Sequence, residues 1–260
     1  MKRFILATLW CLLTILVPLT ARAHFIWIES EPKGEPGKSH KVEIYFGEPH
    51  EFLREEAGGR LDQHDSIEAW AAAAKGEKIN IALKKGVNLF SGAVILRAVG
   101  RYNIIAKSLG HEVQGSQSDR GTSRPLFFAR GQFFSFERGR VSEREEEIKE
   151  HLDLDIIPVT KSLDPLIGSI VPKVGNEFVV RVIFKGKPVT RKRVNAFGPN
   201  GWIKELPSTD SWGVTSFVPL WPGRYVLQIS QDEKAPGEFQ GKSYDTLNYR
   251  ATLTTLVDDR

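Results

Sequence analysis

The sequence predicts an all-β protein with two tandem immunoglobulin-like β-sandwich domains after a cleaved signal peptide. Two observations carry this prediction. Two sequence patterns occur twice in the same order, and the apolar residues inside them fall on alternate positions. Successive side chains of a half-buried strand point to opposite faces, so this period of two is typical of β-strands. We expect the two copies at 24–139 and 152–260, with a charged connector at 140–151 between them.

The first repeated pattern is a glycine followed by an alternating strand, at 37–46 and again at 175–184. The second pattern is Gly-Arg-Tyr at the start of a late strand, with Tyr102 in the first copy and Tyr225 in the second. A tyrosine in this place is typical of the tyrosine corner of immunoglobulin-like sandwiches. Each copy is therefore expected to be a sandwich of several short strands.

Three segments depart from the strand pattern. Residues 66–75, with four consecutive alanines after Trp70, are expected to form a short helix or a lid. Residues 108–125 are rich in Gly, Ser, Gln and Arg, and we expect a long polar loop there. The connector 140–151 is the most charged part of the chain, and Ser142 with Glu145 offers a capping box for a short solvated helix.

The first 23 residues have the parts of a secretory signal peptide. Lys2 and Arg3 precede an apolar run at 4–19, and Ala-Arg-Ala at 21–23 offers a cleavage site. We therefore expect export to the periplasm, with His24 as the first residue of the mature protein. The apolar run is too short to remain as a transmembrane helix, and no later run is long enough, so no membrane span is expected in the mature chain.

Composition excludes several classes of site. The only cysteine, Cys11, lies in the signal segment, so the mature chain can form neither a disulfide nor a thiolate metal site. Three of the 36 Lys and Arg leave with the signal, so 33 remain against 32 Asp and Glu, a net charge of +1. Such a balance gives no reason to expect a nucleic-acid partner. The common motifs of hydrolases, zinc proteases and nucleotide-binding enzymes are absent from the sequence, and no enzymatic activity is expected.

His24 is the first candidate metal ligand. After cleavage, its α-amino nitrogen and a ring nitrogen can close a chelate ring on a transition-metal ion. His50 lies in a turn directly after a strand, between Glu48 and Glu51, and His64 lies in the loop Asp-Gln-His-Asp. We expect His24, His50 and His64 to bind the metal with water completing its shell, although the last two also suit a polar hairpin tip.

The remaining histidines have other expected roles. His40 lies on an alternating strand, where we expect a partly buried packing residue. His111 follows a strand end and is expected to be structural or to face solvent. His151 belongs to the charged connector and is expected to be solvated. Every histidine thus falls in the first copy or the connector, so a metal site is expected in 24–139.

Several further motifs resemble those of a known family. They include His24 with Trp27 in one strand, Gly-Lys-Pro at 186–188, Pro-Gly-Arg-Tyr at 222–225 and the closing strand at 249–254. The pattern is similar to periplasmic components of cobalt/nickel ABC-type transport, a family of exported two-domain β proteins. This resemblance implies Ni(II) or Co(II) as the bound ion, a membrane metal-transport complex as partner, and His24 as a ligand. Cu(II) is also possible at an N-terminal histidine chelate.

A second function class stays open. Trp202, Trp212 and Trp221 could form a face for stacking sugars, and the polar loop 108–125 could take part in binding. The alternative prediction is therefore a metal-free carbohydrate-binding or adhesion module outside the cytoplasm. In that case the histidines would be incidental.

Overall fold

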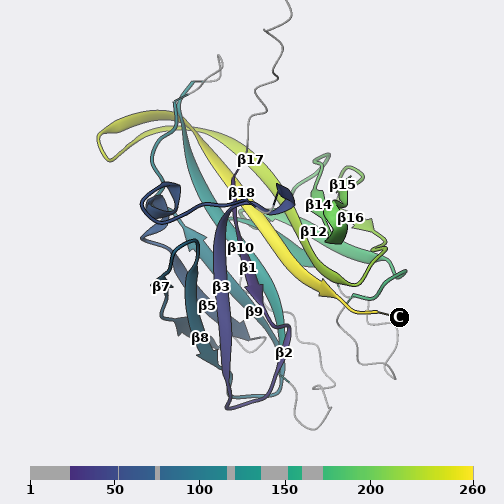
Figure 1. Cartoon of the computed structure of the whole chain (residues 1–260). Helices are drawn as coiled ribbons and strands as arrows, with labels where there is room; N and C mark the ends of the chain where they lie inside the picture. Colours follow the sequence, from purple (N-terminus) through teal and green to yellow (C-terminus); the bar gives the residue numbers. More distant parts are fainter. Residues whose placement is uncertain are drawn as a thin grey trace, which may run out of the picture.

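Figure 1 shows the computed structural model of the chain, which describes residues 24–51, 53–73, 77–115, 121–135, 152–159 and 172–259. This part consists of strands and short 3-10 turns, so the predicted all-β fold is confirmed. Within it, no helix is long and apolar enough to cross a membrane. The predicted signal peptide and the predicted connector lie outside the described residues.

The described strands form three sheets, which we call the first outer sheet, the central sheet and the second outer sheet. The first outer sheet has the order β1 (Phe25–Ser30), β3 (Ser39–Glu48), β8 (Phe90–Ile95) and β7 (Lys84–Lys85), with β4 (Leu53–Arg54) paired to β3. The central sheet has the order β15 (Ile203–Glu205), β14 (Asn195–Phe197), β17 (Gly223–Phe239), β18 (Lys242–Val257), β10 (Ser123–Ser135), β9 (Gly100–Ser108), β5 (Glu68–Ala73) and β6 (Lys78–Ile81), with β2 (Lys33–Gly34) paired to β10. The second outer sheet has the order β11 (Leu154–Pro158), β12 (Phe178–Phe184) and β13 (Lys187–Pro188), with β16 (Val214–Phe217) paired to β12. The 3-10 turns are η1 (Pro49–Glu51), η2 (Arg60–His64) and η3 (Pro199–Gly201).

The two copies repeat the same arrangement. In the first outer sheet β3 pairs with β1 and β8, and in the second outer sheet β12 pairs with β11 and β16, antiparallel in each case. The hydroxyl of Tyr102 donates to the backbone oxygen of Ala98 at 3.2 Å, and that of Tyr225 donates to Trp221 at 3.1 Å. Both bonds reach four residues back along the chain, so the predicted tyrosine corners are present in both copies.

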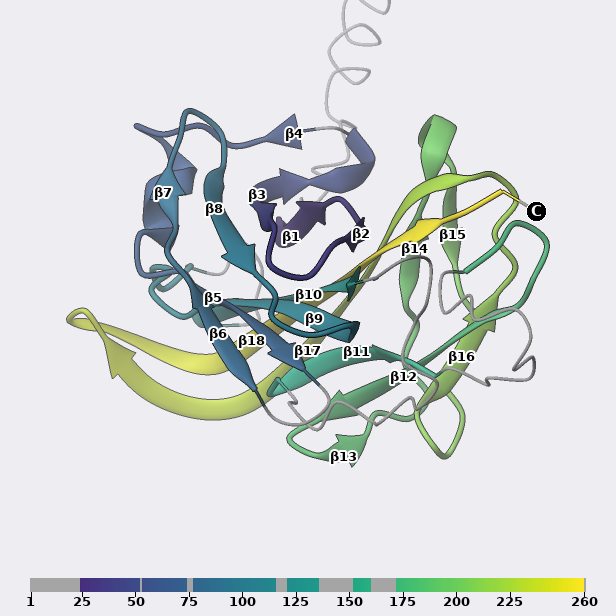
Figure 2. The same cartoon turned by 90° about the horizontal axis from the view of Figure 1, so that it is seen from below.

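The central sheet lies between the two outer sheets, as Figure 2 shows. Its strands β9 and β10 are buried on both faces. Ile104 and Phe127 belong to the hydrophobic cluster under the first outer sheet, whereas the adjacent Ile105 and Phe128 belong to the cluster under the second. A strand that is covered on both faces has apolar residues at successive positions. The sequence of such a strand therefore lacks the alternation of apolar and polar residues.

The same burial explains one wrong expectation. Residues 68–73 form strand β5 rather than the short helix or lid expected at 66–75. Trp70 and Ala72 pack in one cluster, and Ala69 and Ala71 pack in the other. The run of alanines shows no alternation because both faces of β5 are covered, and its high helix propensity is overridden by this packing.

The two copies also share structure. Strand β10 of the first copy pairs in parallel with β18 of the second, from Ser123 with Thr246 to Gly131 with Thr254. One hydrophobic cluster combines Trp70 and Phe128 of the first copy with residues of the second copy such as Val180. The boundaries expected at 24–139 and 152–260 stay a prediction, but a sheet and a core run across them.

Candidate metal centre

The site is built where strands β1 and β3 meet. Phe25 pairs with Gly47 in the antiparallel register. His24, which precedes β1, and Glu48, the last residue of β3, therefore lie at adjacent strand ends. Strand β4 then returns along β3, with Leu53 opposite Glu48. A side chain at residue 47 would collide with the backbone oxygen of Leu53. The φ angle of Gly47 is 147°, in the region that favours glycine. Gly47 therefore permits the tight return that brings η1 and Glu55 against His24.

The carboxylate of Glu48 lies between two imidazoles. Its Oε1 is 3.6 Å from Nδ1 of His24, and its Oε2 is 3.6 Å from Nε2 of His50. The side chain of Glu48 is only 3% exposed, and that of His24 only 7%. Within the described residues, Glu48 Oε1 is buried and has no hydrogen-bond partner. A buried carboxylate oxygen without a donor is unfavourable unless a cation or another ligand approaches it.

Glu51 completes a group of candidate ligands. One ligand atom each from Glu48, His50 and Glu51 lies within 4.8 Å of the others. Two carboxylates and an imidazole nitrogen suit a first-row divalent transition-metal ion better than they suit Ca²⁺ or Mg²⁺, which prefer oxygen ligands alone.

Glu55 holds the ring of His24 from its other side. The distance between His24 Nε2 and Glu55 Oε1 is 2.5 Å. An ionised carboxylate can only accept a hydrogen bond, so Nε2 of His24 is the donor in this contact. Nη1 of Arg60 lies 3.3 Å from the same ring nitrogen. Carboxylates that fix the tautomer of a metal-binding histidine in this way are common in metal sites. The backbone oxygen of His24 accepts a bond of 3.0 Å from Arg250, whose own pKa is lowered by burial to about 10.

His64, also expected as a ligand, lies elsewhere in the first copy. It is fully buried, its Nδ1 is 2.8 Å from the hydroxyl oxygen of Ser108, and its ring lies 4.0 Å from that of Phe46. Burial is the main cause that lowers its pKa to about 3, with smaller contributions from His111 and His24. In the structure, His24 and His50 both contact the carboxylate of Glu48. The ring of Phe46 lies between His64 and His24, with its centre 5.3 Å from that of His24.

The other histidines fall near their expected places. His40 is largely buried, and its ring lies 3.7 Å from that of Phe133, which confirms the packing role expected for it. His111 is buried with its ring 5.3 Å from that of His64, which fits the structural expectation and not the solvent-facing one. Burial is the main cause that lowers its pKa to about 4. His151 lies outside the described residues.

Sequence reasoning missed Glu55. It is separated from His24 by 31 positions, and only the pairing of β4 with β3 brings it close. Its neighbours in the sequence, Glu56 and Arg54, are also charged, so no local pattern distinguishes Glu55 from a solvated acid. The register of β3 and β4 was the missing information.

One family model covers most of the chain. It is described as a domain of unknown function, DUF4198, and it matches residues 21–233. The chain belongs to the DUF4198 family. The match includes all of the candidate metal centre. The finer resemblance to cobalt/nickel transport components goes beyond this DUF4198 match. No curated protein matches the sequence.

Two solved structures are among the structural matches of this DUF4198 member. A BSP domain of a biofilm-associated protein has 12% identity and a TM-score of 0.26, over 89% of this chain and 30% of that one. A marsupial T cell receptor has 8% identity and a TM-score of 0.27, over 92% of this chain and 74% of that one. The chain thus spans less than a third of the length of the first protein. The fold therefore rests on the sheets and tyrosine corners described above.

Proposed function

We propose that the mature protein binds Ni(II) or Co(II) in the periplasm through His24, Glu48 and His50, and supplies the ion to a metal-uptake complex in the membrane. The observation that carries this proposal is the carboxylate of Glu48, which is buried between two imidazoles with one oxygen lacking a hydrogen-bond partner among the described residues. A divalent cation at this point would compensate the buried charge.

The position of the histidine at the expected cleavage site strengthens this proposal. Nδ1 is the ring nitrogen nearer to the α-carbon, and it is the one that faces Glu48. A metal ion bound to Nδ1 can therefore also bind the free α-amino group of a processed His24, while Glu55 occupies Nε2. Glu51 and water would complete the shell. A shell that includes water suits a carrier, because an incompletely closed site can release its ion.

Delivery to an uptake complex is supported by the resemblance to cobalt/nickel transport components. It leads to a measurable expectation in cells. Cells that lack this protein should accumulate less radioactive nickel or cobalt at low external concentration than cells that carry it. Unchanged accumulation of both ions would contradict the delivery role and leave the binding proposal to the experiment below.

The free amine of His24 gives the sharpest test of binding. One extra residue before His24 moves the α-amino group away and leaves the imidazole and the net charge unchanged. The affinity for Ni(II) or Co(II), measured by isothermal titration calorimetry, should fall by at least about tenfold, or about 1.4 kcal/mol. His24→Ala should weaken binding at least as far, and Glu48→Gln should also weaken it.

Matched variants make this result interpretable. Glu205→Gln removes an exposed carboxylate that pairs with Arg193 and should leave the affinity unchanged. His151→Ala in the connector should do the same. If the extended protein binds as tightly as the processed one, the amine chelate is wrong. If Glu48→Gln also binds like the wild type, the proposed site is wrong as a whole.

A further inference from the structure

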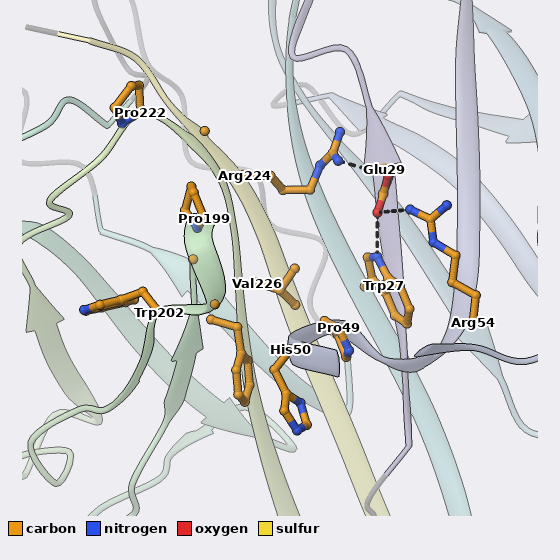
Figure 3. Close-up of a pocket in the computed structure, with 14 residues that line it drawn as sticks. Trp27, Glu29, Pro49, His50, Arg54, Pro199, Trp202, Pro222, Arg224 and Val226 are labelled. Carbon is orange, nitrogen blue, oxygen red and sulfur yellow. Dashed lines mark hydrogen bonds and ion pairs between the residues drawn. The ribbon is translucent and has the colours of Figure 1, made fainter. Parts of the chain in front are cut away.

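A small pocket lies beside the metal centre, where the two copies face each other. Figure 3 shows it between β1 and η1 of the first copy and η3 and β17 of the second. Its volume is about 300 Å³, at the lower end of the range for pockets that hold small molecules. The pocket therefore suits a ligand of one ring and not a polymer or a protein loop.

One end of the pocket carries an excess of positive charge. The carboxylate of Glu29 accepts hydrogen bonds from Arg54 at 3.1 Å, from Arg224 at 2.9 Å and from the indole nitrogen of Trp27 at 3.0 Å. All three bonds can be followed in Figure 3. Two guanidinium groups thus share a single carboxylate, which leaves one net positive charge.

The two arginines have donors to spare. A guanidinium has five N–H donors, and the contacts with Glu29 use one nitrogen of each group. The hydrogen bonds with Glu29 also restrict both guanidinium groups before a ligand binds. The side-chain entropy that they would lose on binding is therefore smaller. Guanidinium groups bind planar carboxylates through paired hydrogen bonds. The chemistry at this end therefore suits an anionic group, and a planar carboxylate matches the guanidinium geometry.

The walls of the pocket are aromatic. Trp27 stacks on Tyr45 with a ring separation of 5.5 Å, Phe197 stacks on His50 at 4.9 Å, and Trp202 lines the side that belongs to the second copy. These contacts hold the rings rigid. Rigid aromatic walls pack well against the flat, apolar C–H face of a small ring.

Polar groups occur between the aromatic walls. Nδ1 of His50 is buried without a hydrogen-bond partner among the described residues. Gly201 and Gly223 also line the pocket. A ligand hydroxyl could satisfy Nδ1 of the lining residue His50, so a hydroxylated ring suits the pocket better than a wholly apolar one.

We propose that this pocket binds a monosaccharide acid, with its carboxylate against Arg54 and Arg224 and its ring between Trp27, Phe197 and Trp202. The proposal needs no metal ion and is separate from the function proposed above. It differs from the sequence-based alternative of an extended stacking face, because Trp212 and Trp221 do not line the pocket.

The ligand side of the test uses three matched compounds. Isothermal titration calorimetry compares glucuronate with glucose, which has the ring without the carboxylate, and with acetate, which has the carboxylate without the ring. Glucuronate should bind at least about tenfold more tightly than either, since each removes one of the two contacts. Equal binding of glucose and glucuronate, or no binding of glucuronate at about 10 mM, would overturn the proposal.

The protein side uses two arginine variants of the whole mature chain. Arg224→Gln should weaken glucuronate binding by about tenfold or more, because Glu29 keeps Arg54 as its partner and the pocket keeps its shape. Arg193→Gln removes an exposed arginine outside the pocket and should have no effect. Trp202→Leu should weaken binding while its circular dichroism stays that of the wild type. Glucuronate affinity that is the same in Arg224→Gln and Arg193→Gln would show that the pocket is not the site.

Discussion

The strand β3 and the equivalent strand β12 continue differently in the two copies. In the first copy, β3 continues through Gly47 and Glu48 into η1, and Glu48 is only 3% exposed. In the second copy, the equivalent β12 ends at Phe184 and turns at once through Lys185 and Gly186 into β13. There the side chain of Lys185 is 45% exposed and pairs with Glu233 on the surface.

This difference shows how the candidate site arises. Lys185 and Gly186 have φ values of 49° and 76°, which makes a tight two-residue hairpin turn. In this place the first copy has the turn η1, which supplies His50 and Glu51, and Glu55 follows the returning strand β4. The scaffold is thus repeated, while the candidate metal ligands occur in one copy only.

The largest effect is expected from dividing the protein. The sequence alone predicts that 152–260 is an independent domain. The structure leads us to expect that this fragment lacks a cooperative thermal unfolding transition, because its core also contains Trp70, Ile105 and Phe128 of the first copy. Circular dichroism of the fragment, with the chain 24–260 as control, measures this. A cooperative β-rich fragment would mean that the second copy is independent after all.

A buried ion pair joins the two copies and gives the next effect. Arg130 of β10 and Asp155 of β11 are each 1% exposed, with Nε of the arginine 2.9 Å from Oδ1 of the aspartate. Arg130→Met leaves Asp155 buried without this partner and should lower the free energy of unfolding by about 3–5 kcal/mol. Chemical denaturation measures it. Arg193→Met, which breaks an exposed pair, should change it by at most about 1 kcal/mol.

The double variant sharpens this test. Arg130→Met with Asp155→Leu removes both charges, so no carboxylate is left buried alone, and much of the lost stability should return. If Arg130→Met is no more harmful than Arg193→Met, the pair does not hold the copies together.

The contribution of histidines to acid destabilisation should come from the first copy, because the second copy contains no histidine. In the unfolded chain a histidine takes up a proton below about pH 6.5. The folded pKa of His64 is lowered to about 3, so the stabilisation is present above pH 6.5 and is lost as the pH falls towards 3. By pH 4.5 this histidine should account for a loss of about 2–3 kcal/mol.

The His64→Leu variant isolates that contribution. Urea unfolding without metal at pH 7 and at pH 4.5 should show a smaller loss in the variant than in the wild type, by about 2–3 kcal/mol. His111, with a pKa lowered to about 4, remains in both proteins and continues to destabilise them in acid. Equal losses in the two proteins would mean that His64 is protonated without unfolding.

The sequence predicted those features that depend on local pattern. The alternation at 37–46 and the Gly-Arg-Tyr motifs identified β3, β12 and both tyrosine corners, because period and turn chemistry are encoded in a few adjacent residues. For the candidate site, the sequence named His24, His50 with its acidic neighbours, and also His64, whose Nδ1 the structure places against Ser108. The shared sheet, the strand at 68–73 and the role of Glu55 depend on which strands pair over long distances, and an apolar run covered on two faces gives no period that a single sequence can reveal.

The smallest effect tests whether the two copies remain equivalent in their scaffold. Tyr102→Phe and Tyr225→Phe each remove one hydroxyl that bonds to the backbone four residues earlier, at Ala98 and Trp221. Each should lower the free energy of unfolding by about 0.5–1.5 kcal/mol, the usual contribution of one hydrogen bond. Chemical denaturation at constant pH measures both, and Tyr244→Phe, outside the two corners, is the control. Because the geometry is the same in both copies, we expect the two losses to agree within about 0.5 kcal/mol. A loss confined to Tyr102→Phe would mean that the repeat is preserved in shape but not in its contribution to stability.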